Sequence, residues 1–337
     1  MMEYPNTLTD ERQWRELTAR VASWFSPEAL ARITGGGASA TERYGCEWLL
    51  IGGKRWRPLL TAAIYWASVE GPIDAIAPAA VAVECFHKAS LIHDDIEDDD
   101  NERYGVATVH ARYGVPMAIN VGDWLIGEGY RLLAGMAFPD DVRSELVRVA
   151  AEGHRQLCLG QGNELAYCSE PKPCSEDEVI LLYRRKTASA FEVAVQIGAA
   201  LAGIDEATRS RLSEWTRLIG IAYQIQDDRE DFSSVRGRRG DILACRPTLY
   251  LALAGASTEQ EVRDAVEAAQ RDRSPERLER LQTVIAASSI PRSVDALFLT
   301  YCRQMRDALD GIAPVPLRGI LKRITEGAFP RDAEVKF

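Results

Sequence analysis

Wherever this chain shows a hydrophobic pattern, the period is that of a helix rather than of a strand. Apolar residues recur at three- and four-residue spacings through most of the sequence, and no hairpin dipeptide is flanked by alternating β-branched residues. An all-α fold is therefore expected. The helices predicted most clearly cover residues 58–70, 75–96, 116–135, 142–165, 176–202, 206–228 and 247–254.

The breaks between these segments are short. None of them is long or polar enough to serve as an interdomain linker, so one helical domain over residues 1–337 is expected. The breaks fall at residues 34–38, 51–58, 71–72, 139, 169–175 and 233–240.

Composition excludes several classes of protein. With 40 basic and 50 acidic residues, the net charge of −10 argues against a nucleic-acid partner. The 7 cysteines are scattered without a CxxC pair, which favours a reduced, cytoplasmic protein over a disulfide framework or a zinc site. The longest apolar stretch, residues 73–86, contains Asp74 and Glu84, so we expect a buried helix there and no transmembrane segment.

Two acidic clusters about 130 residues apart repeat the pattern Asp-Asp-x-x-Asp. On a helix the first and last carboxylates stand at i and i+4 on one face with the middle one beside them, so they repel one another unless a cation intervenes. Mg²⁺ takes hard oxygen ligands from one or two carboxylates together with substrate phosphates. Two facing clusters would thus hold a diphosphate through metal ions. The clusters are Asp94, Asp95, Asp98 and Asp227, Asp228, Asp231.

A solvated helix face is the usual explanation of a single acidic patch. Here, however, both clusters continue apolar segments, residues 81–92 and 218–225. Carboxylates are seldom left at the buried end of a helix without counter-ions, which favours the metal site.

Basic residues precede the first acidic cluster. Residues 52–58 combine two glycines, three cations and a proline suited to the first turn of a helix. Cations at a helix N-terminus oppose the macrodipole, so an anion is expected there, although a surface cluster is the simpler alternative. His87 lies two helical turns before Asp94, and by itself it could equally be a core histidine.

Taken in order, these segments resemble the trans-polyprenyl diphosphate synthases, a family that includes the geranylgeranyl and farnesyl diphosphate synthases. The resemblance runs from about residue 52 to residue 248. It implies an isoprenoid synthase-type helical bundle around a deep central cavity, a homodimer, and both acidic motifs at the cavity mouth. The motifs that carry it are Gly-Gly-Lys-Arg-Trp-Arg-Pro (52–58), Ser-Leu-Ile-His-Asp-Asp-Ile-Glu-Asp-Asp (90–99), Arg103 with Gly105, Gly122-Asp123, Gly160-Gln161, Lys186-Thr187 and Tyr-Gln-Ile-Gln-Asp-Asp-Arg-Glu-Asp (223–231).

The resemblance also implies roles for individual residues. All six aspartates would serve catalysis, with about three Mg²⁺ ions per site. The metal ligands would be Asp94, Asp98, Asp227 and Asp231. Arg103, Lys186 and Arg238 would contact the allylic diphosphate. Lys54, Arg57 and His87 would bind isopentenyl diphosphate. Thr187 and Gln224 would steady the reacting carbon.

The implied reaction needs no protein nucleophile. Mg²⁺ and cationic side chains neutralise the departing diphosphate, an allylic carbocation forms, and the isopentenyl double bond attacks it. In this family the residues four and five before the first aspartate help to set product length. They are Ser90 and Ala89 here, and their small size favours products of about C20 or longer unless Phe86 or Trp124 closes the cavity.

Tyr104 is the main departure from the family pattern, because it replaces an arginine that normally contacts isopentenyl diphosphate. A phenol cannot supply that charge-assisted contact, so binding should weaken by ~1.5–3 kcal/mol. Restoring arginine is then expected to lower the Michaelis constant. Softer departures are Glu164 for aspartate and arginines at 238 and 246 for lysine.

Three hypotheses follow. The chain is an elongating prenyltransferase that retains Lys54, Arg57 and His87; or it ionises a single allylic diphosphate and cyclises or hydrolyses it; or it is a weakly active partner subunit. Intact aspartate motifs argue against the third hypothesis, and the first is favoured.

Overall fold

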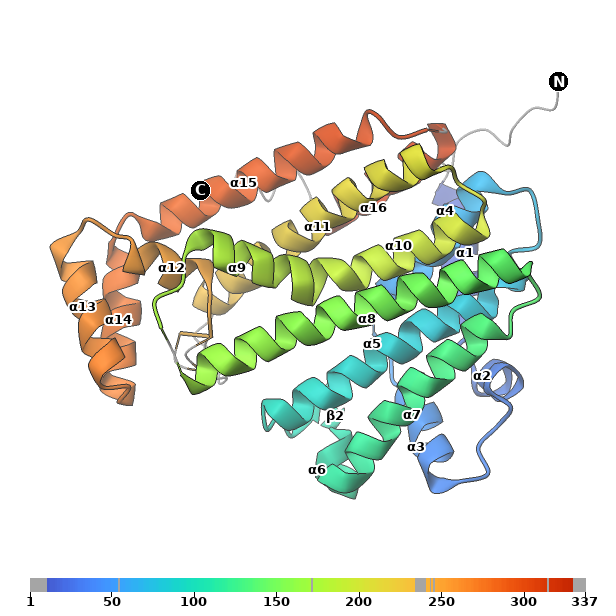
Figure 1. Cartoon of the computed structure of the whole chain (residues 1–337), viewed down its shortest axis with the longest axis horizontal. Coiled ribbons are helices and arrows are strands. Elements are labelled where there is room, and N and C mark those ends of the chain that lie inside the picture. Colours follow the sequence, from blue (N-terminus) through green and yellow to red (C-terminus); the bar gives the residue numbers. More distant parts are fainter. Residues whose placement is uncertain are drawn as a thin grey trace. The chain divides into compact units, whose positions relative to one another are not determined.

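The structure, a computed structural model, confirms the all-α expectation (Figure 1). It describes residues 11–53, 55–170, 172–233, 241–242, 244, 246–313 and 315–329. Every helix predicted from periodicity is present, as α4 (Trp56–Ser68), α5 (Ala77–Glu97), α7 (Val115–Ala134), α8 (Asp140–Ser169), α9 (Glu176–Tyr183) with α10 (Ser189–Leu201), α11 (Glu206–Ser233) and α12 (Leu249–Gly255).

Other elements complete the chain. A 3-10 turn, Ile73–Ile76, leads into α5, and a π-helical turn, Arg184–Ala188, joins α9 to α10. One short hairpin, β1 (Glu102–Arg103) with β2 (Val106–Ala107), was not expected from the sequence. The remaining helices are α1 (Glu11–Ser23), α2 (Pro27–Thr34), α3 (Ala40–Leu50), α6 (Val109–Tyr113), α13 (Gln260–Arg271), α14 (Pro275–Ala287), α15 (Ile290–Leu309) and α16 (Val315–Ala328).

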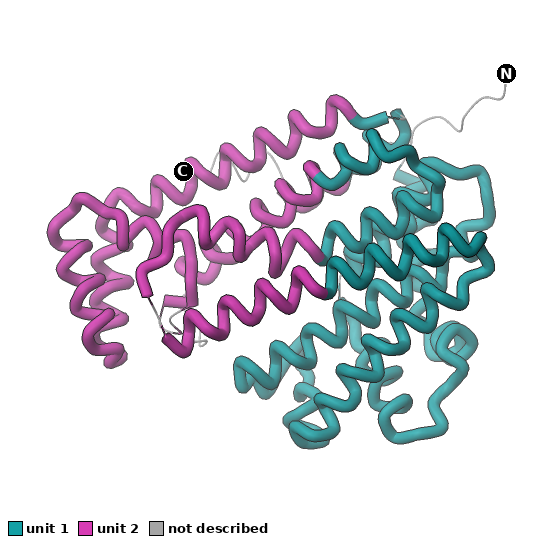
Figure 2. Tube along the Cα trace, viewed as in Figure 1, with its two compact units in different colours: residues 1–154, 190–213, 312–323 teal, residues 155–189, 214–311, 324–337 magenta. Residues whose placement is uncertain are grey.

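The chain divides into two compact units, each assembled from separate stretches (Figure 2). Unit 1 comprises residues 1–154, 190–213 and 312–323, and unit 2 comprises residues 155–189, 214–311 and 324–337. The first acidic motif belongs to unit 1 and the second to unit 2. A single domain over residues 1–337 stays a prediction.

Helix α5 is the core helix of unit 1. Seven consecutive residues, 79–85, are buried, so the helix is covered on all sides. By length and composition, residues 73–97 would also suffice to cross a membrane, yet 67% of the tested window is buried, as expected of a core helix.

Glycines on α7 let this helix approach α5 closely. Gly122 and Gly129 lie two turns apart on one face of α7. A Cβ at Gly122 would collide with the His93 ring, and one at Gly129 would stand 2.7 Å from the Phe86 ring. Close packing therefore fixes the end of α5 that carries the first acidic motif.

In unit 2, α11 packs against the π-helical turn at Gly220. A Cβ at this glycine would collide with Ala188, so any side chain there would displace the turn. Elsewhere on α11, Trp215 is fully buried and donates a hydrogen bond from Nε1 to Thr325 Oγ1 at 3.2 Å. These contacts hold α11, and with it the second acidic motif.

Candidate active site

Each acidic motif lies at the C-terminal end of its helix. Helix α5 ends at Glu97 and α11 at Ser233, so both sets of carboxylates stand near the negative end of a helix dipole. That position disfavours further negative charge unless cations are bound.

The first and last aspartates of each motif reach solvent. Asp98 and Asp227 are exposed, while Asp94 and Asp231 are partly exposed. Their hard oxygen donors at i and i+4 suit Mg²⁺. Within the part of the chain that the structure describes, no three His, Cys, Asp or Glu side chains form a metal-holding group by themselves.

The second aspartate of each motif, which the sequence places beside the other two, is buried. Asp95 is fully buried and accepts a hydrogen bond from Arg103 Nε at 2.5 Å. Asp228 is 3% exposed and accepts hydrogen bonds from the Tyr183 hydroxyl and, at 3.4 Å, from Gln224 Nε2. Burial raises the pKa of Asp228 to about 8 and also raises the pKa of Asp95. These two carboxyls fix the motifs rather than face solvent.

The structure brings Arg57 and His87 together in unit 1. Arg57 Nη1 lies 3.3 Å from His87 Nε2, and the guanidinium stands 5.2 Å from the centre of the Phe191 ring. Burial holds the pKa of His87 well below its usual value, and the nearby charges of Arg57 and Lys88 lower it further. A neutral histidine among cations is a suitable donor to an anion.

The unit 2 residues lie on and around the π-helical turn. Lys186 Nζ lies 2.7 Å from Glu164 Oε1, so the longer arm of Glu164 preserves an ion pair despite the departure from aspartate. Thr187 donates to Gln224 Oε1 at 2.7 Å. A Cβ at Gly160 would stand 2.8 Å from the Lys186 backbone nitrogen, which explains a glycine there. π-helical turns are frequent at functional sites.

Tyr104 lies at the tip of the hairpin. Tyr104 and Gly105 have φ angles of 56° and 75°, as in the type I′ turn that favours a tight two-residue connection. The tyrosine is 49% exposed, and its ring centre lies 4.6 Å from Lys88 Nζ. A Cβ at Gly53 would lie 3.6 Å from the Tyr104 hydroxyl. The hairpin thus carries Tyr104 to the basic segment.

Three charged residues beside these, Arg55, Glu84 and Lys88, were not predicted as site residues. Arg55 forms a buried ion pair with Glu84 at 2.7 Å, and its guanidinium stands 4.1 Å from the centre of the Phe25 ring. Lys88, one turn beyond Glu84, is 1% exposed. In the sequence, Lys88 and Glu84 interrupt a largely apolar helix, and this interruption could have marked them as site residues.

The product-length residues also lie on α5. Ala89 is buried and Ser90 is partly exposed, with its hydroxyl bound to the His87 carbonyl. One turn earlier, the Phe86 ring contacts the Tyr130 ring edge to face, with 5.0 Å between the ring centres. Tyr130 in turn lies 3.4 Å from His154 Nδ1. Trp124, the other residue that could close the cavity, packs against Gly45 of α3.

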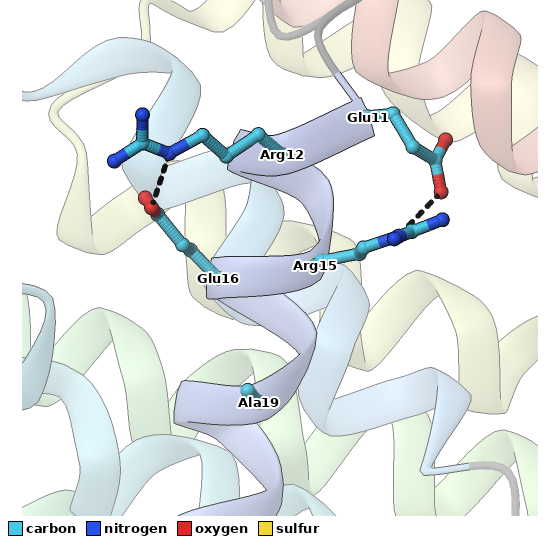
Figure 3. Close-up of a pocket in the computed structure, with 5 residues that line it drawn as sticks. All are labelled: Glu11, Arg12, Arg15, Glu16 and Ala19. Atoms are coloured by element: carbon cyan, nitrogen blue, oxygen red, sulfur yellow. Dashed lines mark hydrogen bonds and ion pairs between the residues drawn. The ribbon is translucent and has the colours of Figure 1, made fainter.

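Two predicted site residues, Lys54 and Arg238, lie outside the described residues. A solvent-exposed hollow on α1 is unrelated to either acidic motif (Figure 3). There Arg12 pairs with Glu16 and Arg15 with Glu11, all of them exposed. Such i,i+4 pairs are ordinary features of a solvated helix.

Comparison with known proteins agrees with this fold. The polyprenyl synthetase family model matches residues 43–287. A geranylgeranyl diphosphate synthase of Methanosarcina mazei is 30% identical over 83% of this chain and 86% of its own length. A short chain isoprenyl diphosphate synthase of Methanocaldococcus jannaschii is 38% identical over 53% of this chain, a match that spans about half (54%) of that relative.

Solved structures share the helical fold. The geranylgeranyl pyrophosphate synthetase of Geoglobus acetivorans superposes with a TM-score of 0.78 at 27% identity, covering 94% of this chain and 100% of that one. The corresponding synthetase of Pyrococcus horikoshii gives a TM-score of 0.80 at 24% identity, covering 95% and 99%. The chain belongs to the polyprenyl synthetase family.

Proposed function

We propose that this protein is a prenyltransferase that condenses an allylic diphosphate with isopentenyl diphosphate, head to tail (1′-4). The observation that carries the proposal is the exposure pattern of the two acidic motifs. In each motif the first and last carboxylates are at least partly exposed while the second is buried. The exposed carboxylates stand at the negative ends of helices and require cations there.

Asp94 and Asp98, and Asp227 and Asp231, are the residues that would hold Mg²⁺, about three ions per site. Bound Mg²⁺ would neutralise charge on the departing diphosphate. Asp95 and Asp228 support these ligands from the buried side, through their hydrogen bonds to Arg103 and Tyr183.

The cationic side chains complete the binding of substrates. Arg103, Lys186 and Arg238 add fixed positive charge for the allylic diphosphate, which favours its ionisation in a site that excludes water. Lys186 forms an ion pair with Glu164. A phosphate oxygen of the substrate can replace the Glu164 carboxylate as the partner of Lys186. Arg57 and the neutral His87 bind the diphosphate of isopentenyl diphosphate.

The bond-forming step depends on how the protein positions the two substrates. The hydrogen bond from Thr187 to Gln224 fixes two polar groups beside the reacting carbon. With both substrates held in register, the isopentenyl double bond attacks the allylic cation, and the released diphosphate takes the proton that is lost.

The small residues at positions 89 and 90 favour a product of about C20 or longer, with Phe86 and its contact to Tyr130 as the next barrier. We expect Ser90→Phe to shorten the product and Phe86→Ala to lengthen it. Chromatography of the dephosphorylated products measures both changes. Unchanged product lengths in both variants would contradict this part of the proposal.

One assay tests the reaction itself. The purified protein is supplied with Mg²⁺, labelled isopentenyl diphosphate and C5, C10 or C15 allylic diphosphates, and in parallel with a C15 or C20 diphosphate alone. Longer labelled diphosphates are the expected products. Hydrocarbon or alcohol formed from the single substrate, without incorporation of label, would instead support the hypothesis that the chain ionises one allylic diphosphate and cyclises or hydrolyses it.

The proposal includes a homodimer in the cytoplasm, on the strength of the family resemblance. Sedimentation equilibrium of the purified chain measures its oligomeric state, and a monomer at assay concentration would remove the dimer from the proposal.

A further inference from the structure

Lys88 is a buried cation that forms no direct ion pair with a carboxylate of the described residues. Its Nζ donates to the Ile51 carbonyl at 2.9 Å and stands 5.3 Å and 4.6 Å from the ring centres of Trp48 and Tyr104. A carbonyl and two aromatic faces solvate an ammonium poorly compared with water. Burial accordingly lowers the pKa of Lys88 to about 8.

The surroundings of Lys88 carry a surplus of positive charge. Arg55 and Arg103 lie near it together with the carboxylates of Glu84 and Asp95. Each carboxylate already has an arginine partner, since Arg55 pairs with Glu84 at 2.7 Å and Arg103 with Asp95 at 2.5 Å. Arg57, beside His87, adds a further cation. Asp100 also lies 3.8 Å from Arg103. The cations of Arg55, Arg57, Lys88 and Arg103 still outnumber the carboxylates of Glu84, Asp95 and Asp100, so an anion that enters this cluster would meet net positive charge.

Tyr104 covers this ammonium from the solvent side, with its ring centre 4.6 Å from Nζ. The residue is 49% exposed and projects from the tip of a two-residue turn. An arginine in the same place would bring a guanidinium against Lys88, and two adjacent cations with partial burial repel each other. A cation at position 88 and a cation at position 104 are therefore alternatives.

We propose that Lys88 binds the diphosphate of isopentenyl diphosphate, and that it supplies from α5 the positive charge that this chain lacks at position 104. The inference rests on the proposed function, because it assigns a residue to that substrate. It also changes the expectation for Tyr104→Arg, which should no longer improve binding while Lys88 is present.

The roles of Lys88 and Tyr104 are tested by the direct binding of isopentenyl diphosphate, measured by calorimetry without an allylic substrate. Lys88→Met, which keeps an unbranched side chain one atom shorter, should weaken binding by about ten- to a hundredfold, as expected for loss of a charge-assisted hydrogen bond. Lys322→Met, which removes an exposed lysine of the same unit, is the matched control and should bind like wild type.

The double variant Lys88→Met/Tyr104→Arg separates binding from a structural role. Lys88 also ties the Ile51 carbonyl to α5, and Tyr104→Arg cannot restore that bond. Recovery of affinity to within a fewfold of wild type, with Tyr104→Arg alone giving no gain, is the expected result. Circular dichroism and thermal melting show that each variant is folded.

Wild-type affinity in Lys88→Met, or weak binding that Tyr104→Arg does not recover, would overturn the assignment. A failure of the proposed function would give a different result. If wild type binds isopentenyl diphosphate through Lys88 but incorporates no label, the reaction is wrong and the binding residue stands. If label is incorporated equally by wild type and Lys88→Met, with the same Michaelis constant for isopentenyl diphosphate, only the role of Lys88 is wrong.

Discussion

Neighbouring aspartates in this protein have opposite environments, although the sequence presents them as equivalents. Asp227 is exposed, whereas Asp228 is 3% exposed and hydrogen-bonded by Tyr183. The Tyr183 hydroxyl also accepts a hydrogen bond from the Leu249 backbone N–H at 3.1 Å. Asp228 therefore links the second motif to the start of α12.

Substitution of these neighbours should separate activity from stability. Asp227→Ala should reduce turnover by orders of magnitude with little change in thermal stability, because an exposed carboxylate that we propose as a metal ligand is lost. Asp228→Ala should destabilise the fold by ~1–3 kcal/mol, because a buried hydroxyl loses its acceptor. Steady-state kinetics and chemical denaturation measure the two effects. Near-normal turnover in Asp227→Ala, or unchanged stability in Asp228→Ala, contradicts this division.

Lys88 makes stability depend on pH in a defined direction. In the folded protein burial lowers its pKa to about 8, with Glu84, Arg55, Arg103 and Asp95 as its charged neighbours. In the unfolded chain a lysine stays protonated up to about pH 10.4. Between these two values the unfolded state binds more protons, so the contribution of Lys88 to the free energy of unfolding rises with pH.

The free energy of unfolding of wild type relative to Lys88→Met should therefore rise by ~2 kcal/mol between about pH 7.5 and pH 9.5. The difference between the two proteins removes the titration of the other groups, and urea denaturation at each pH measures it. Parallel pH profiles would show that Lys88 titrates at an ordinary pKa.

Among the helices, α11 has two tasks in unit 2. It ends in the second acidic motif, and at Gly220 it supports the π-helical turn that carries Lys186 and Thr187. The turn widens the backbone at this place, so the side chains of both residues depend on how closely α11 approaches.

Gly220→Ala should destabilise the protein by ~1–3 kcal/mol and lower turnover, because the added methyl group collides with Ala188. Gly162→Ala, on α8, has no atom within 4 Å of the new Cβ and should stabilise the helix by ~0.5–1 kcal/mol without loss of activity. Melting curves and initial rates compare the two variants. Equal behaviour would mean that α11 does not support the turn.

The molecule as a whole contains no ready-made metal cage among the residues that the structure describes. Mg²⁺ and a diphosphate should therefore bind together rather than separately, since each completes the site for the other. Ligands that bind only the folded state raise its stability by mass action.

Mg²⁺ together with inorganic diphosphate should raise the melting temperature by several degrees, roughly the effect of ~1–3 kcal/mol of binding. Either component alone should raise it much less, and EDTA should abolish the joint effect. Asp94→Ala is the control that should lose the synergy. Additive shifts in wild type would contradict metal-assisted binding of the diphosphate.

Helical periodicity was enough to predict α4, α5, α7–α12 and the fold class, because a buried stripe must recur at the helical period. The hairpin at residues 102–107 was missed. Its strands have two residues each and its turn, Tyr104-Gly105, lacks the asparagine or aspartate that usually marks a type I′ turn. Contacts across the fold hold it, rather than local propensity.

The sequence by itself determined the family and the residue types of the site, since the order of its motifs and the i,i+4 spacing of its aspartates are properties of the linear chain. The burial of a residue and its long-range partners are not properties of the linear chain. The tertiary structure showed that Asp95 and Asp228 face inward, and that Lys88 stands against Tyr104. Both depend on which side of a helix its neighbours cover, because only packing decides which carboxylate or ammonium loses its water.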